Sequence, residues 1–83
     1  MKIKLKLFAT LGSYLPPGSR GGETLVDLPD AATIPEVLGV LGVPVNLAHI
    51  VFVNGRHVLR PNLPTHLLHE GDTLAVFPAI GGG

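Results

Sequence analysis

The chain lacks cysteine, a surplus of either charge and any long apolar run. Without cysteine, it has no disulfide framework, no thiolate metal site and no cysteine nucleophile. Six basic and six acidic residues give a formal net charge of zero. This balance argues against nucleic acid as the main partner, because phosphate binding needs a surplus of Lys and Arg. The apolar runs are too short to cross a bilayer, so no membrane partner is expected.

The residues that are present indicate one folded domain. The chain has 83 residues, of which 46% are hydrophobic and only 14% are charged, too apolar a composition for a disordered segment. A chain of this size buries roughly 60–65% of its unfolded surface, which is enough for one core. Its N-terminal stretch alternates lysine with apolar residues and has no signal-peptide apolar segment, so we expect a cytoplasmic location.

The first predicted strand has one charged and one apolar face. Lys2, Lys4 and Lys6 alternate with apolar residues, and Phe8 follows on the lysine side. Such a strand belongs to a sheet that is covered on one side only. The lysines can form a basic binding site or a solvated face, and the solvated face is the more common case.

A short helix is predicted from residue 34 onward. Thr33 is a candidate N-cap, and Glu36 completes a capping box three residues later. Gly42 fits the position after the last helical residue. One apolar stripe at helical spacing gives the helix a single buried face; it consists of Ile34, Val37, Leu38 and Leu41.

The remaining strands are predicted on both sides of this helix. They cover residues 23–28, 50–53, 56–59 and 73–77, with a type I′ turn at Asn54-Gly55 between the two central ones. A Pro- and Gly-rich loop over 15–22 connects the first two strands as an antiparallel pair. The order predicts an α+β fold, a β-grasp (ubiquitin-like) small mixed sheet with one helix packed on one face.

The last seven residues form an unusual end. The predicted final strand runs into Pro78, and the sequence finishes on Gly81, Gly82 and Gly83. Glycine has no Cβ and adopts many conformations, so three in a row make a thin and pliable arm. Five residues beyond the proline can extend about 17 Å. The arm is either a frayed end or a carrier of the terminal carboxylate into a partner's active site.

Four stretches, taken together and in this order, resemble the ThiS/MoaD family of ubiquitin-like sulfur carrier proteins, in particular the small subunit of molybdopterin synthase. They are residues 7–11 (LFATL), which resemble the end of the family's first strand, residues 51–55 (VFVNG), residues 70–78 (EGDTLAVFP) and the terminal Gly82-Gly83. The resemblance implies one domain over 1–83 with a flexible C-terminal tail at 79–83. Gly81 looks more like the thiamine branch, whereas the Phe-Ala segment and the length favour the molybdopterin branch.

The resemblance also implies the chemistry. A ubiquitin-activating-like adenylyltransferase uses ATP to adenylate the Gly83 carboxylate, and a desulfurase- or rhodanese-type sulfur donor converts it to a thiocarboxylate. The large synthase subunit then receives the sulfur for molybdopterin biosynthesis. Gly81 and Gly82 give the tail clearance. The chain is then a carrier and not an enzyme, and it binds no cofactor itself. A thiamine-thiazole carrier, a ubiquitin-like modifier and a plain interaction module remain alternatives.

Aromatic residues beside this tail predict a partner-binding surface. Strand alternation places Phe8 and Phe77 on the lysine-side face, close together if the first and last strands are parallel neighbours; Phe52 extends the pair. Exposed aromatics are favoured at the centre of protein interfaces. The alternative is that the loop 60–69 folds over the rings and makes a second small core.

Histidines give only a weak indication of a metal site. His66 and His69 can share one helical turn, with Glu70 or Asp72 as a third ligand. A metal site would also need partners that orient these ligands, so solvated loop histidines are the better interpretation and no metal is predicted.

Overall fold

A computed structural model describes residues 1–79, and the predictions for Gly81, Gly82 and Gly83 lie outside the described residues. The strands are Lys2–Leu7 (β1), Glu23–Asp27 (β2), Ile50–Val53 (β3), Arg56–Val58 (β4) and Thr73–Phe77 (β5). The α-helix α1 spans Ile34–Val40, and the 3₁₀ helices η1, η2 and η3 span Ala9–Tyr14, Val45–Leu47 and Arg60–Asn62.

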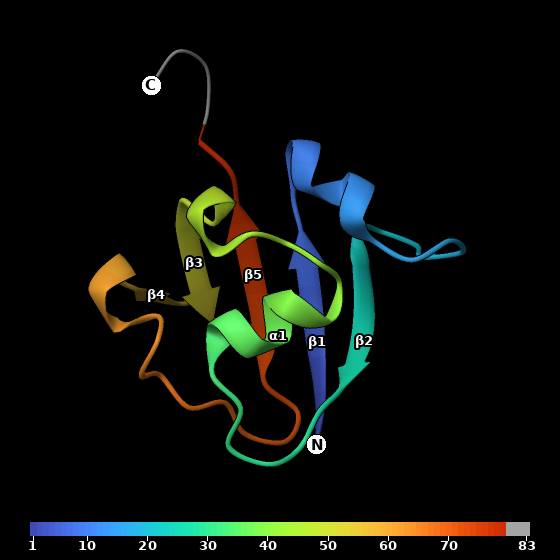
Figure 1. Ribbon diagram of the computed structural model, residues 1–83. Helices are drawn as coiled ribbons and strands as arrows, with labels where there is room; N and C mark the ends of the chain where they lie inside the picture. Colours follow the sequence, from blue (N-terminus) through green and yellow to red (C-terminus); the bar gives the residue numbers. More distant parts are fainter. Residues whose placement is uncertain (80–83) are drawn as a thin grey trace.

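The five strands form one mixed sheet in the order β2-β1-β5-β3-β4. The two central strands, β1 and β5, are parallel, and the other neighbouring pairs are antiparallel. The helix α1 lies across one face of this sheet (Figure 1). The predicted α+β, β-grasp architecture is confirmed, including the parallel pairing of the first and last strands.

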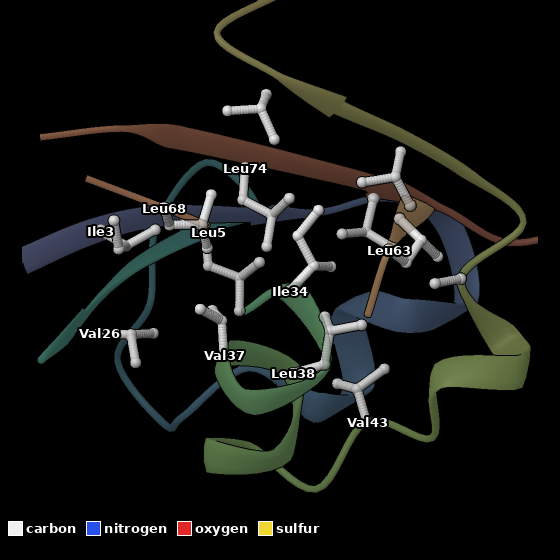
Figure 2. Packing of buried hydrophobic residues seen from close by; sticks show 14 of the residues in the cluster. Ile3, Leu5, Val26, Ile34, Val37, Leu38, Val43, Leu63, Leu68 and Leu74 are labelled. Atoms are coloured by element: carbon white, nitrogen blue, oxygen red, sulfur yellow. The ribbon is translucent and has the colours of Figure 1, made fainter. Parts of the chain in front are cut away.

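The core lies between α1 and the helix-side face of the sheet, where apolar side chains from the helix and the strands meet (Figure 2). Ile3 and Leu5 alternate with the lysines of β1 and are fully buried, as the strand pattern predicts. Leu63 and Leu68 come from the segment that connects β4 to β5 and belong to the same cluster. No helix within residues 1–79 is long and apolar enough to cross a membrane.

The helix begins as its sequence predicts. The Glu36 carboxylate accepts hydrogen bonds from the Thr33 backbone N–H (3.0 Å) and hydroxyl (2.9 Å), and the capping box is complete. Pro35 lies in the first turn. The helix ends at Val40, and Gly42 follows with φ +75°, a left-handed conformation that glycine adopts without a Cβ penalty.

The β3–β4 hairpin also follows prediction. Asn54 and Gly55 both have positive φ, 51° and 81°, as a type I′ turn requires. The Asn54 side chain joins this turn to the start of β5: its amide N–H donates to the Asp72 carboxylate, and its carbonyl accepts from the Thr73 N–H, both at 2.8 Å. The strands predicted at 56–59 and 23–28 each end one residue earlier.

One prediction is wrong. The first strand ends at Leu7, and the stretch 7–11 does not continue it, because the 3₁₀ helix η1 begins at Ala9 with φ +51°. The turn buries Leu11, which is 2% exposed, and an extended continuation would carry this side chain past the core. Because η1 is short and has no apolar periodicity, the sequence does not show whether residues 9–11 continue the strand or turn away from it.

Candidate functional site

Two aromatic rings mark the end of the sheet where β5 finishes. The β1–β5 register pairs Leu7 with Val76, so Phe8 comes beside Phe77. The Phe8 N–H donates to the Val76 carbonyl at 3.1 Å, which holds its backbone extended beyond β1. The two rings stack with centroids 4.1 Å apart and planes 10° apart. The predicted proximity of Phe8 and Phe77 is confirmed.

The third predicted aromatic joins them from β3. Phe52 meets Phe77 edge-on, with ring centroids 6.0 Å apart and planes at 86°. Phe52 also contacts the imidazole of His57 on β4, with ring centroids 5.4 Å apart. Phe52 and Phe77 are half-buried and Phe8 is 38% exposed. The three rings form one continuous surface in geometries that aromatic pairs favour.

Residues 60–69 do not fold over the aromatic rings, so this alternative is wrong. Its apolar residues Leu63 and Leu68 are buried in the main core. The Leu68 N–H donates to the Ala32 carbonyl at 2.9 Å, and Thr33 forms a β-bridge with Leu67. The segment is therefore tied to the start of α1, so these residues make no second core over the rings.

A groove beside the rings adds residues that the sequence pattern did not single out. It has a volume of about 440 Å³ and is lined by His49, Ile50, Phe52, Phe77 and Pro78. The register pairs Ile50 with Phe77, and the His49 N–H donates to the Phe77 carbonyl at 2.9 Å. Ile50 was within reach of sequence reasoning, because strand alternation places it on the same face as Phe52.

The apolar surface continues to the edge strand β4. Val51 pairs with Val58, so continuing this register by one residue places Leu59 opposite Ile50. Leu59 is extended (φ −69°, ψ 147°) and 57% exposed. The register gives a row of apolar residues across four chain segments. We define the docking row as Phe8, Phe77, Ile50 and Leu59, with Phe52 in the next row.

Arg60 supports one wall of the groove. Its guanidinium donates a hydrogen bond of 2.7 Å to the carbonyl of Ala48, a fully buried residue between η2 and β3. The backbone N–H of the adjacent His49 donates a hydrogen bond to the Phe77 carbonyl. The wall is thus fixed between η3 and β5, although 12 residues separate Arg60 from Ala48. No local sequence pattern predicts such a contact.

Two of the three lysines of β1 are solvated, and the third lies beside the rings. Lys2 and Lys4 are exposed and lie 3.9 Å from Asp27 and 3.5 Å from Glu23 on β2. Exposed pairs at these distances contribute little to stability. Lys6 is half-buried and lies next to Phe8 on the open face of the sheet.

The histidines that were weighed as metal ligands do not converge. The His69 imidazole lies 3.8 Å from the Asp72 carboxylate, whereas the backbone N–H of His66 donates to the Asn62 carbonyl. No group of three His, Asp or Glu side chains able to hold a metal ion occurs among residues 1–79.

Comparison with protein families gives a match to the ThiS family model over residues 5–83. The chain belongs to the ThiS family. The match covers the docking row and extends through Gly83, beyond the residues that the structure describes. Members of this family are small carrier proteins, which agrees with the carrier role expected from the sequence.

Solved structures show how this ThiS-family chain relates to others. The HVO 2177 protein of Haloferax volcanii has 29% identity and TM-score 0.76, with 100% of this chain and 87% of that chain covered. SAMP1, small archaeal modifier protein 1 of the same organism, has 27% identity and TM-score 0.69, with both chains fully covered. A comparison with curated proteins found no match.

A more distant likeness shows the fold alone. It is to a chain in the complex of subunits 1 and 2 of the molybdopterin-converting factor from Helicobacter pylori 26695, with 17% identity, TM-score 0.59 and both chains fully covered. The ThiS-family chain thus has the ubiquitin-like fold that sulfur carriers share with archaeal protein modifiers.

Proposed function

We propose that this chain is a sulfur carrier whose Gly83 carboxylate is converted to a thiocarboxylate. The observation that carries the proposal is the ThiS-family match, which runs through the Gly-Gly end of the sequence. The position of the docking row supports it. β5 ends in Phe77 within this row, so the segment that leads to Gly83 departs directly from the candidate docking surface.

The first chemical step is activation of the carboxylate. A carboxylate is a poor electrophile, and an adenylyltransferase of the ubiquitin-activating type changes this with ATP. A carboxylate oxygen of Gly83 attacks the α-phosphorus, pyrophosphate leaves, and an acyl-adenylate forms. The chain supplies the substrate group and the docking surface, and ATP binds to the activating enzyme.

Sulfur enters in the second step. The chain has no cysteine, so the sulfur comes from a separate donor of the desulfurase or rhodanese type. The terminal sulfur of a persulfide attacks the acyl carbon and AMP leaves, which gives an acyl disulfide. A second thiol then reduces the S–S bond, which releases the thiocarboxylate and leaves a disulfide. Glycines at positions 81 and 82 allow close approach of the activating enzyme, because they carry no Cβ.

As the acceptor we propose the molybdopterin precursor, held on a large synthase subunit that docks on the aromatic surface. The resemblance of residues 7–11 to the molybdopterin branch supports this choice. A thiamine-thiazole acceptor is the alternative within the same chemistry. Both acceptors use the same thiocarboxylate, so the carrier step is tested separately from the acceptor.

A second candidate function is that of a ubiquitin-like modifier. The likeness to SAMP1, at 27% identity over the full length of both chains, favours it. A modifier would use the same adenylate and then form an amide with a lysine of a target protein. The two functions therefore differ only in which nucleophile, persulfide or amine, attacks the acyl carbon.

Intact mass spectrometry tests these functions. Chain purified from its source organism, with and without the activating enzyme, should show the mass increase of one oxygen-to-sulfur exchange only when that enzyme is present. Lysine conjugates without that exchange would instead identify a modifier. Gly83→Ala, and a chain with one residue appended after Gly83, should both lose the exchange while keeping the wild-type melting temperature. Thiocarboxylate formation in either variant would contradict the mechanism.

A further inference from the structure

The zero net charge of the sequence conceals a separation of charge along the sheet. The register defines the two ends: β1 starts, β2 ends and β5 starts at the end far from the docking row. In Figure 1 this is the end near the label N, and β5 finishes at the opposite end. Five of the six acidic side chains lie at the far end, together with Lys2, Lys4 and Arg56. Lys6 and Arg60 lie beside the docking row.

Five of the six acidic residues belong to the far end. Asp27 pairs with Lys2, and the Glu70 carboxylate accepts the Lys2 N–H at 3.0 Å. The Lys4 N–H donates to the carbonyl of Asp72 at 3.0 Å. The last two acidic residues are Asp30 and Glu36. Asp30 lines a hollow together with Leu67 and Glu70. Leu67 also forms a β-bridge with Thr33, whose N–H donates to the Glu36 carboxylate.

The docking end carries cationic and imidazole side chains. The row beneath the docking row runs Lys6, Ala75, Phe52 and His57 in consecutive register pairs across four strands. Lys6 and His57 therefore stand on either side of the aromatic surface. Arg60 and His49 lie at the groove wall, as described above. We call Lys6 and Arg60 the basic rim; the imidazoles of His49 and His57 lie beside it.

One acidic residue lies near this rim. Glu23 is opposite Lys6 in the β1–β2 register, on the edge strand away from the rings. Its carboxylate points to Lys4, 3.5 Å from the ammonium group. Among residues 1–79, Lys6 makes no ion pair, whereas Lys2 and Lys4 each make one. The lysine beside the rings thus keeps its charge for a partner.

We propose that the partner protein which accepts the docking row presents an apolar surface edged by Asp and Glu side chains. The inference rests on the proposed function and specifies its partner. Complementary charge around an apolar centre raises the association rate and fixes the orientation of two proteins. At the end of the sheet where β5 leads to Gly83, such a partner meets Lys6 and Arg60. At the far end carboxylates outnumber cationic groups, although Lys2 and the N-terminal ammonium group lie close to two of these carboxylates, Asp27 and Asp30.

The test compares two lysines on the same face of the same strand. Lys6→Gln removes a charge from the basic rim, and Lys2→Gln removes one at the acidic end. The probe is the purified ubiquitin-activating-like adenylyltransferase of the source organism. Its association rate with the full chain is measured by surface plasmon resonance from low to high salt, alongside ATP-dependent adenylation. Lys6→Arg keeps the charge and controls for the side chain itself.

We expect the wild-type association rate to fall with salt. Lys6→Gln should lower the association rate about 3- to 5-fold at low salt, because one exposed ion pair contributes up to about 1 kcal/mol. It should also flatten the salt dependence of the rate, because salt screens this interaction in the wild type. Lys6→Arg should keep the wild-type rate. Lys2→Gln should leave the rate unchanged or raise it. Equal melting temperatures for the three variants would exclude a folding defect.

Two results would overturn the inference alone. One is adenylation of wild type with an association rate that neither salt nor Lys6→Gln changes. The other is salt-sensitive self-association of the free chain in sedimentation, abolished by Lys6→Gln, which assigns the basic rim to the acidic end of a second copy. Absence of any adenylation of wild type would overturn the proposed function and the inference together.

Discussion

The two faces of the sheet use the same five strands for different tasks. On β5, Leu74 and Val76 face the helix and are fully buried, while Thr73, Ala75 and Phe77 alternate with them on the open face and are half-buried. The helix-side face stabilises the fold by removing apolar area from water. The open face stays accessible to a partner. Because successive strand residues point to opposite faces, stability and recognition can be changed separately, one residue apart.

The largest expected effect comes from the helix-side face. Leu74→Ala removes a side chain with no exposed surface and leaves a cavity, so we expect a loss of about 2–5 kcal/mol in the free energy of unfolding. Urea denaturation followed by circular dichroism measures it. Thr73→Ala, one residue away on the open face, is the matched control and should change stability by less than about 1 kcal/mol. Similar losses for both variants would contradict the statement that the helix-side face, and not the open face, stabilises the fold.

A change on the open face should affect binding more than stability. Phe77→Ala removes the ring that stacks on Phe8 and meets Phe52, so we expect binding to the activating enzyme to weaken about 30-fold or more, as at interface hot spots. The loss of stability should be about 1–2 kcal/mol, because the ring makes two aromatic contacts but is only half-buried. Isothermal titration calorimetry and thermal melts give the two values.

Leu25→Ala is the control for Phe77→Ala. Leu25 is 64% exposed, is an apolar residue, and pairs with Lys4, away from the rings. Its truncation should leave binding at the wild-type value. If Leu25→Ala weakened binding as much as Phe77→Ala, the whole open face would act as the interface, and the docking row would have no special role.

Arg60→Ala should have an intermediate effect at the groove wall. It leaves the buried Ala48 carbonyl without its charged donor, so we expect a loss of about 1.5–3 kcal/mol locally or globally. Amide hydrogen exchange should speed up at His49, whose N–H bonds to Phe77 across the groove. Arg60→Lys retains a donor and should restore part of the protection. Unchanged exchange at His49 in Arg60→Ala would show that the wall is fixed by β3–β5 pairing alone.

The smallest effect is expected at the capping box of α1. Hydrogen bonds from the Thr33 backbone N–H and hydroxyl lower the pKa of Glu36 below its usual value, against a small opposing effect of burial. A lowered pKa in the folded state means that the charged form stabilises the fold above the ordinary Glu pKa. This stabilisation is lost as the pH falls through the lowered value.

An NMR titration of the Glu36 side chain tests this statement. Thr33→Ala should raise the Glu36 pKa toward its usual value, because the hydroxyl donor is lost while the backbone donor remains. Glu36→Gln should remove the corresponding part of the acid dependence of the melting temperature. A Glu36 pKa that is the same in wild type and Thr33→Ala would assign the lowering to the backbone bond alone.

The regular elements were largely predictable because their signals are local. Lysine and apolar residues alternate over 2–7 with the period of a strand, Thr33 and Glu36 have the spacing of a capping box, and Asn54-Gly55 favours a type I′ turn. Each signal arises from geometry within a few residues. The structure agrees with each of them.

The candidate site was predictable only in part. Phe8, Phe52 and Phe77 could be assigned to the open face from alternation and the expected strand order. The roles of Leu59 and Arg60 could not be predicted. Leu59 joins the row through a strand register with Ile50, nine positions away, and Arg60 donates a hydrogen bond to Ala48, 12 positions away. The 3₁₀ helix at Ala9–Tyr14 was missed because so short a turn has no periodicity to detect.

By itself, the sequence determined the alternation of faces, the capped helix, the tight hairpin and the glycine-rich end, since each depends on the conformational preferences of neighbouring residues. Only the tertiary structure decided that residues from four separate segments form one docking row. It also decided that a chain of zero net charge keeps its basic rim beside that row and most of its carboxylates at the other end. Strand register sets these distances, and register is decided by packing between segments that are remote in the sequence.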